Sequence, residues 1–355
     1  MKRLALFLAL AIAGMNIVAC SSEDNSSAIE EVKPGENPSD SNNPGDDGNN
    51  PGDDGNNPGD NGNNGDDDNP MGGEKPSDGT ISNPDEAVGP STTDKAPMSG
   101  MVNLWTRGNI PATTKNANNS DGADFIPNME VFTVGEETTP KGAVVICPGG
   151  AFMFRSIQNE GYDVANMLTR LGYQCFVVNY RISPYTMQES ATDLQRAIRY
   201  VRAHATDYRI NPQNIALVGF SAGGILNGEV LLNWRDLKNG TSLDANYQPD
   251  ALDNIPVSAC AVGMIYSFYG RLSVSMNNVA TLRAANLPPA FYCWGTRDGF
   301  AGQFTQNSNA VREAGCQVQT KILQNYPHGY GTGGNASVWG NDFDAFLTPI
   351  MNKNN

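Results

Sequence analysis

Residues 210–224 read Ile-Asn-Pro-Gln-Asn-Ile-Ala-Leu-Val-Gly-Phe-Ser-Ala-Gly-Gly, an apolar run followed by a serine between glycines. The run at 215–218 predicts a buried strand, and the stretch 222–235 predicts a helix. Ser221 then stands on a sharp strand-to-helix turn, where Gly219 and Gly223 are needed because larger side chains would collide across it. The helix N–H groups that follow would favour negative charge at this point. The segment therefore predicts a nucleophilic serine, in preference to a purely structural Gly/Ser turn.

The chain on either side of this turn alternates apolar runs with helix-like patterns. Because the predicted strands are continuously apolar, they favour a mostly parallel sheet that helices cover on both faces, the α/β class. The residues between the third helix and the next strand, 236–256, predict a loop. The predicted strands are 143–147, 174–180, 215–218, 257–264, 289–295 and 317–323, and the predicted helices are 159–171, 188–205, 222–235 and 337–351.

A serine hydroxyl needs a base, and the chain has two histidines, His204 and His328. His328 follows the strand at 317–323 in a glycine-containing loop, where an imidazole can reach the turn at Ser221. His204 lies near the end of a predicted helix, a place where a histidine is usually solvated or complements the helix dipole. We therefore predict His328 as the base.

The base needs a carboxylate that orients the ring and stabilises its charged form. Asp298 lies in the turn that follows the strand at 289–295 and precedes His328 by 30 residues, which gives the chain order serine, aspartate, histidine. Asp250 and Asp253 also lie between serine and histidine, but in the irregular segment. Asp298 is the predicted third member, and a turn-stabilising cap is its alternative role.

An oxyanion hole requires two N–H donors. One is predicted at Ala222, directly after the serine. The second is predicted at Ala151, or otherwise at Gly150, in the segment Pro-Gly-Gly-Ala-Phe (148–152) that ends an earlier strand. Glycines there let the backbone approach a substrate.

The acidity of the chain is confined to its first part. Residues 1–99 hold 5 Lys+Arg and 19 Asp+Glu, a net charge of −14, whereas residues 100–355 hold 18 and 19, a net charge of −1. The second part is therefore near neutral, which excludes a basic nucleic-acid-binding surface. The low overall isoelectric point says nothing about the site.

Residues 1–19 are predicted to be a signal peptide, with Lys2 and Arg3 before a short apolar run. The sequence Ile-Val-Ala-Cys at 17–20 resembles the lipobox of bacterial lipoproteins, which implies lipidation of Cys20 and an outer-membrane anchor facing the cell surface or the periplasm. The alternative is a plain secretory signal with an incidental cysteine. Acidic residues after Cys20 resemble the surface-export signal of Bacteroidetes lipoproteins.

Residues 20–98 are predicted to be a disordered acidic tether, and residues 99–355 the catalytic domain. The tether repeats Asn, Pro, Gly and Asp with a period of seven and has few residues that could bury surface. Its aspartates match neither an EF-hand nor the nonapeptide calcium repeat. The five later cysteines are predicted to be buried thiols, although a disulfide stays open.

Together these motifs resemble the α/β-hydrolase superfamily, and within it the esterase/lipase branch of bacterial acetyl esterases and bifunctional acetylxylan/feruloyl esterases. The resemblance covers residues 101–350 and implies the α/β-hydrolase fold. This chain has Pro-Gly-Gly-Ala at 148–151 where many relatives have His-Gly-Gly-Gly, and Ile-Leu at 225–226 where relatives often have His-Leu. The motifs are CPGGAF (147–152), VVNYRISP (177–184), DLQRAIRYVRAHA with INPQNIALVGFSAGG (193–224), GTRD (295–298) and YPHG (326–329).

The resemblance implies a serine esterase that removes small acyl groups, above all acetyl, from a polysaccharide such as xylan. No metal or organic cofactor is required. A peptidase or lipase-like hydrolase on the same triad, and an inactive surface glycan-binding lipoprotein, are the alternatives. Four residues are candidates either for the acyl or sugar pocket or for packing: Phe152, Met153, Tyr185 and Tyr330.

Overall fold

The computed structural model describes residues 88–113, 121–122, 124–235, 238–334 and 337–354. Within them an eight-stranded sheet has the order β1-β2-β4-β3-β5-β6-β9-β10. Strands β1, β2 and β4 pair antiparallel in succession, and all pairs from β4 to β10 are parallel. The strands are β1 (Gly100–Asn103), β2 (Asn128–Phe132), β3 (Gly142–Cys147), β4 (Tyr173–Asn179), β5 (Ile215–Phe220), β6 (Ala261–Ile265), β9 (Ala290–Gly295) and β10 (Val318–Leu323).

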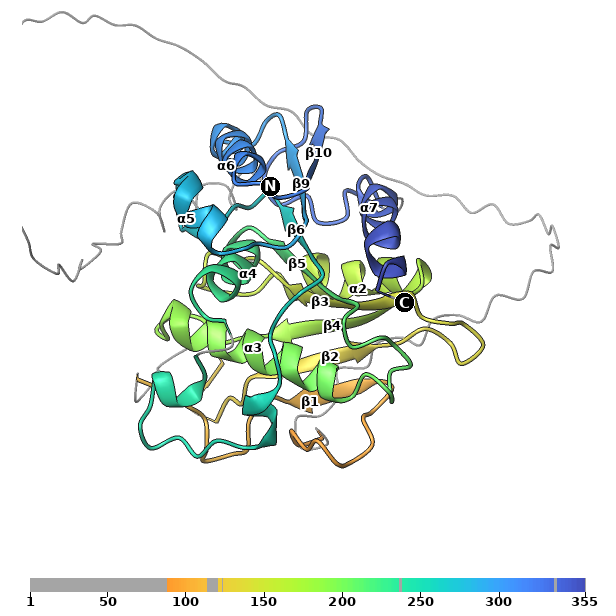
Figure 1. Cartoon of the computed structure of the whole chain (residues 1–355), viewed down its shortest axis with the longest axis vertical. Coiled ribbons are helices and arrows are strands. Elements are labelled where there is room, and N and C mark those ends of the chain that lie inside the picture. Colours follow the sequence, from red (N-terminus) through yellow and green to blue (C-terminus); the bar gives the residue numbers. More distant parts are fainter. Residues whose placement is uncertain (1–87, 114–120, 123, 236–237, 335–336, 355) are drawn as a thin grey trace, which may run out of the picture. The chain divides into compact units, whose positions relative to one another are not determined.

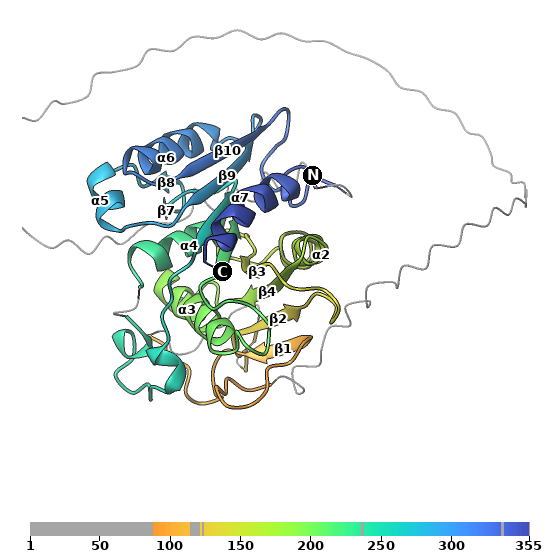
Figure 2. The same ribbon diagram turned by 45° about the vertical axis from the view of Figure 1, so that its right-hand side comes forward.

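Helices cover both faces of this sheet. In Figures 1 and 2, α3, α4 and α6 lie on one face and α2 and α7 on the other. A small hairpin of β7 (Gly270–Arg271) and β8 (Val274–Ser275) follows β6. The helices are α2 (Asp163–Arg170), α3 (Met187–Ala203), α4 (Ala222–Leu232), α5 (Val279–Ala284), α6 (Ala301–Glu313) and α7 (Gly340–Asn352), and short turns of other helix types lie at Ile157–Tyr162, Gly240–Ser242 and Ala251–Asn254.

The central strands are buried because both faces carry helices. Every residue of β3, β5, β6 and β9 is buried. This matches the continuously apolar runs that the sequence shows and confirms the predicted α/β-hydrolase architecture. The carboxyl ends of β3, β5, β6 and β9 meet at one edge of the parallel sheet, where ligands bind in such folds.

The structure contains elements that the apolar pattern did not indicate. Strands β1 and β2 are short and mix polar with apolar residues, so no continuous run marks them. Helix α6 has a weak apolar stripe and buries only part of its surface. The segment predicted as a loop, 236–256, contains two short 3-10 turns among its described residues.

Residues 88–98, which the prediction placed at the end of the tether, pack against the domain. Val88 pairs with Val102, and Ala96 is buried. The Ala96 N–H donates to Asp207 at 3.0 Å, and His204 Nε2 lies 2.7 Å from the carbonyl oxygen of Ser91. The folded domain therefore begins before the predicted boundary at residue 99.

The predicted signal peptide (1–19), Cys20 and the rest of the tether lie outside the described residues. Among the residues that the structure does describe, no helix combines the length and the apolar character needed to cross a membrane.

Candidate active site

Ser221 stands on the sharp turn between β5 and α4, with φ 49° and ψ −118°. A non-glycine residue at positive φ is strained, and it persists only where the surroundings hold it. The turn is closed on both sides: a Cβ on Gly219 would lie 2.5 Å from the backbone of Gly223, and one on Gly223 would lie 2.0 Å from the carbonyl oxygen of Cys147. The predicted need for small neighbours is therefore met at both positions.

Ser221, His328 and Asp298 form one hydrogen-bonded chain. His328 Nε2 lies 2.8 Å from Ser221 Oγ, and its Nδ1 lies 2.7 Å from Asp298 Oδ2. The Asp298 side chain is fully buried, and its other oxygen accepts from the Phe300 N–H at 2.9 Å. This arrangement leaves Nε2 of a neutral imidazole free to accept the serine proton.

The competing residues are occupied elsewhere. His204 is buried against Tyr200, with Nδ1 2.9 Å from Asp207. Asp250 pairs with Arg196 on α3, and Asp253 lies 2.7 Å from the hydroxyl of Tyr247, which donates to it. These side chains hold the scaffold together rather than face Ser221.

The segment Gly150–Phe152 folds into a tight turn beside the serine. Gly150, Ala151 and Phe152 all have positive φ, and the Gly150 carbonyl accepts from the Met153 N–H at 2.9 Å. Within the described residues, no hydrogen bond uses the N–H of Ala151 or of Ala222. Both N–H groups are thus available to a substrate oxygen, and Ala151 lines the same cavity as Ser221.

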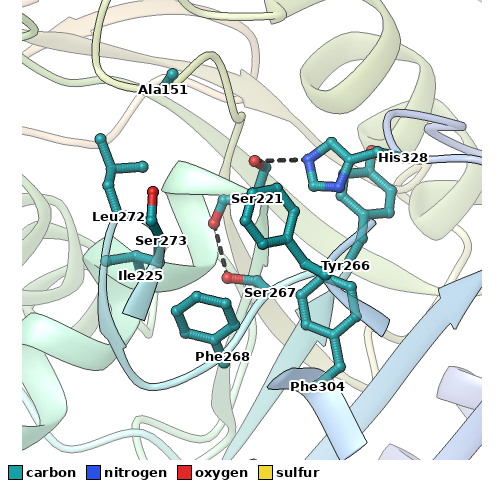
Figure 3. Close-up of a pocket in the computed structure, with 11 residues that line it drawn as sticks. Ala151, Ser221, Ile225, Tyr266, Ser267, Phe268, Leu272, Ser273, Phe304 and His328 are labelled. Carbon is teal, nitrogen blue, oxygen red and sulfur yellow. Dashed lines mark hydrogen bonds between the residues drawn. The ribbon is translucent and has the colours of Figure 1, made fainter. Parts of the chain in front are cut away.

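An apolar cavity opens beside Ser221 (Figure 3). Its lining is almost entirely apolar, which suits an uncharged acyl group next to the serine. The hydroxyl of Ser267 donates to the Ser221 carbonyl at 2.7 Å and fixes the cavity floor. The lining residues are Ala151, Ser221, Ile225, Tyr266, Ser267, Phe268, Leu272, Ser273, Phe300, Phe304 and His328.

The sequence suggested four residues for an acyl or sugar pocket, and none of them is among the residues that line this cavity. Phe152 packs edge-on against Tyr180, and Tyr330 packs on Tyr266 and donates its hydroxyl to Cys293. Met153 is 47% exposed. Tyr185 lies beneath the guanidinium of Arg181. Phe152, Tyr185 and Tyr330 therefore serve packing rather than the pocket.

The sequence analysis did not identify Glu160 and Tyr266, a buried hydrogen-bonded pair next to the site. Glu160 accepts hydrogen bonds at 2.7 Å from the Gly149 N–H and from the Tyr266 hydroxyl. Burial raises the pKa of Glu160, while the two hydrogen bonds and nearby His328 oppose that rise. In the sequence Glu160 stands between Arg155 and Asp163, so no local pattern singled it out.

The five cysteines of the described domain are all free thiols. Burial raises the pKa of Cys175, Cys260 and Cys293 to about 12, so they stay protonated and act as small apolar groups. Cys147, Cys175 and Cys293 are buried as predicted, whereas Cys260 and Cys316 are only partly buried.

Residues 129–283 match the family model described as BD-FAE. The chain is 37% identical over 92 residues to an acetylxylan esterase of Xylanibacter ruminicola, covering 26% of this chain and 19% of that relative. It is 30% identical over 133 residues to the esterase LipC of Mycobacterium tuberculosis, covering 37% of this chain and 31% of the relative. The chain thus spans less than a third of the length of these curated relatives.

Among solved structures, an acetyl ester-xyloside bifunctional hydrolase from Caldicellulosiruptor lactoaceticus superposes with a TM-score of 0.58 at 22% identity. The match covers 72% of this chain and 97% of that one. A thermophilic esterase from Thermogutta terrifontis superposes with a TM-score of 0.53 at 18% identity, over 72% of this chain and 95% of that one.

The sheet order, the turn at Ser221 and these structural neighbours show that the chain has the α/β-hydrolase fold. The family model over residues 129–283 and the curated esterases, each matched over part of the chain, agree with the predicted resemblance to the esterase branch.

Proposed function

We propose that this protein is a serine carboxylic ester hydrolase in which Ser221, His328 and Asp298 are the catalytic triad. The observation that carries the proposal is the chain of two hydrogen bonds, at 2.8 and 2.7 Å, that joins these three side chains. It supplies the base and the orienting carboxylate that a serine hydroxyl requires. The esterases among its relatives support the same activity.

The reaction follows from the geometry. Ser221 Oγ attacks the ester carbonyl while His328 Nε2 takes its proton, and Asp298 stabilises the imidazolium that forms. The N–H groups of Ala222 and Ala151 donate to the oxyanion, with Gly150 as the neighbouring alternative. His328 returns the proton to the leaving alcohol, and water then releases the acyl group from Ser221 by the same route.

The proposed substrate is a small acyl ester, above all acetyl, on a polysaccharide such as xylan. An acetylxylan esterase is among the curated relatives, and one structural neighbour is an acetyl ester-xyloside bifunctional hydrolase. The apolar cavity beside Ser221 suits an uncharged acyl group. Among the described residues, no Lys, Arg, Asp or Glu lines it, which disfavours charged acyl groups.

We also propose that Cys20 carries a lipid anchor that holds the enzyme at the outer membrane of a bacterium. The lipobox-like segment at 17–20 and the Gly/Asn/Asp-rich stretch after it support this placement. An enzyme on a long tether reaches polymer-bound esters that cannot enter the cell. A Cys20→Ser protein expressed in a bacterial host should lose its membrane fractionation and its incorporation of labelled palmitate.

The decisive experiment is acetate release from acetylated xylan, pectin and mannan, run beside a feruloylated substrate and p-nitrophenyl acetate. Wild-type protein should release acetate and react with a fluorophosphonate probe, and Ser221→Ala should do neither. Full activity in Ser221→Ala would overturn the assignment. A wild-type protein that stays unlabelled and releases nothing would instead favour the inactive glycan-binding alternative.

A further inference from the structure

Glu160 is a buried carboxylate directly beneath the candidate site, and the proposed mechanism does not use it. It lies in the π-helical turn Ile157–Tyr162 and is only 5% exposed. Among the described residues, no Lys or Arg forms an ion pair with it. A buried carboxylate without a cation is costly, so its retention calls for a role. Turns of π-helix are frequent at functional sites.

One carboxylate oxygen of Glu160, Oε2, accepts a hydrogen bond from the oxyanion loop, the segment 148–152 that contains Gly150 and Ala151. The Gly149 N–H donates to Glu160 Oε2 at 2.7 Å, and the Gly149 carbonyl accepts from the Ser156 N–H at 2.9 Å, just before the π-helical turn. Gly149 sits so tightly that a Cβ there would lie 2.6 Å from the carbonyl oxygen of Phe220 and 3.0 Å from Cβ of Ser221. Glu160 therefore fixes the position of Gly149, the residue that directly precedes Gly150 and Ala151.

The other oxygen, Oε1, is linked through the Tyr266 hydroxyl to the histidine loop, the loop that carries His328. The Tyr266 hydroxyl donates to Glu160 Oε1 at 2.7 Å and accepts from the Gly331 N–H at 3.1 Å, three residues after His328. The ring of Tyr266 lies 4.9 Å from the His328 ring, centre to centre, and Figure 3 shows the two side by side. Tyr266 has φ 37°, a strained conformation that its surroundings must hold.

We propose that Glu160 is a positioning residue for this active site: one buried carboxylate that ties the oxyanion loop, through Gly149, to the histidine loop, through Tyr266. The inference rests on the proposed hydrolase function, because both loops matter only if Ser221 is the nucleophile. The same carboxylate places a negative charge near His328, where an imidazolium forms during the reaction.

Burial raises the pKa of Glu160, and three neighbouring groups favour its ionised form against that rise. The Gly149 N–H and the Tyr266 O–H both donate to it, and the imidazole of His328 is the nearby cation when protonated. The hydroxyls of Tyr180 and Tyr330 are also near: burial raises the pKa of each, and the negative charge of Glu160 adds a smaller contribution. Around His328 itself lie Asp298, Tyr266 and Phe300. Loss of the Glu160 charge would therefore make the imidazolium less favourable.

The test compares Glu160→Gln with Tyr266→Phe and the double variant, in the full chain. Glutamine keeps an oxygen for the Gly149 N–H and removes the charge. We expect kcat on p-nitrophenyl acetate to fall about tenfold with KM changed less than twofold, because positioning acts on the transition state. The acid limb of the kcat/KM profile should move to lower pH, since the imidazolium loses a neighbouring anion.

Glu229→Gln is the matched control, because Glu229 is another buried glutamate. It lies on α4, and its carboxylate accepts a hydrogen bond from the side chain of Asn233 at the end of that helix. It should leave kcat and the pH profile unchanged. The losses in Glu160→Gln and Tyr266→Phe should be less than additive in the double variant, because the two groups act as one unit.

The outcomes separate this inference from the proposed function. Wild-type protein that neither hydrolyses esters nor labels with a fluorophosphonate would refute the function itself. Active wild type with a Glu160→Gln variant of unaltered kcat and pH profile would overturn the positioning role alone. If Glu160→Gln fails to fold, Tyr266→Phe decides: it keeps the ring against His328, and an unchanged kcat there would also overturn the role.

Discussion

Nε2 of His328 lies 2.8 Å from Oγ of Ser221, although 107 residues separate the two along the chain. The sheet brings them together because β5, β6, β9 and β10 run parallel as neighbours, so the loops after them share one edge. The Arg297 N–H donates to the Tyr326 carbonyl at 3.0 Å, and the Asn325 N–H donates to Thr296 Oγ1 at 2.9 Å. These bonds hold the histidine loop against the turn that carries Asp298.

The strained backbone of Ser221 leads to a stability prediction. Ser221→Ala and Ser221→Gly should each lower kcat/KM by about 10³-fold or more, because both lack the nucleophile. The free energy of unfolding of the glycine variant should be about 1 kcal/mol higher than that of the alanine variant, since φ 49° is strained for any residue with a Cβ. The glycine variant is thus expected to be the more stable of the two. Urea denaturation of the two proteins measures the difference. Equal stabilities would contradict the idea that the turn stores strain.

The two histidines should separate catalysis from stability. His328→Ala should lose ester hydrolysis by about 10³-fold while changing the free energy of unfolding less than His204→Ala does, because the His328 side chain is 21% exposed. His204→Ala should keep kcat but cost about 1–3 kcal/mol, since it removes a buried ring that bonds Asp207 and Ser91. Steady-state kinetics and denaturation of both variants check this, and a large fall of kcat in His204→Ala would count against it.

The cavity wall at Leu272 should set the size of the acyl group. Leu272→Trp should fill part of the apolar cavity, so kcat/KM on p-nitrophenyl butyrate should fall about tenfold more than on p-nitrophenyl acetate. Val274→Trp is the control, because Val274 belongs to the same hairpin region and is 65% exposed outside the cavity lining. Equal losses on both esters would mean that the acyl group binds elsewhere.

The buried thiols should make the fold less stable in alkali. Burial raises the pKa of Cys175 and Cys293 to about 12, whereas an exposed thiol ionises near 8.5. Between these values the folded chain binds more protons than the unfolded chain, so the free energy of unfolding falls as pH rises. Each thiol contributes a slope of about 1.4 kcal/mol per pH unit over that range.

Urea denaturation between pH 8 and pH 10.5 measures this slope. Cys175→Ala should be less stable at pH 8 because of the lost contacts, yet it should lose less stability as pH rises. The same slope in both proteins would rule out a contribution from this thiol.

The nucleophile turn, the triad order and the α/β class could be predicted from local patterns. A glycine at positions 219 and 223 and an apolar run before them follow from steric limits over a short stretch, and β3, β5 and β9 are recognisable because both faces of each are buried. Strands β1 and β2 gave no such signal, since a strand at or near the edge of a sheet needs no continuous apolar run. The attachment of residues 88–98 depends on contacts with Asp207 and His204, more than 100 residues away.

The chain by itself indicated which residues form the proposed triad, because sharp turns, glycine spacing and strand ends are encoded over short stretches. Only the tertiary structure decided what surrounds them. The cavity is lined by Phe268, Leu272 and Phe304 rather than by the residues that stood close to the motifs, and Glu160 reaches both loops of the site. Such neighbours come from separate strands and helices, and their distances depend on how the whole sheet packs rather than on any local spacing.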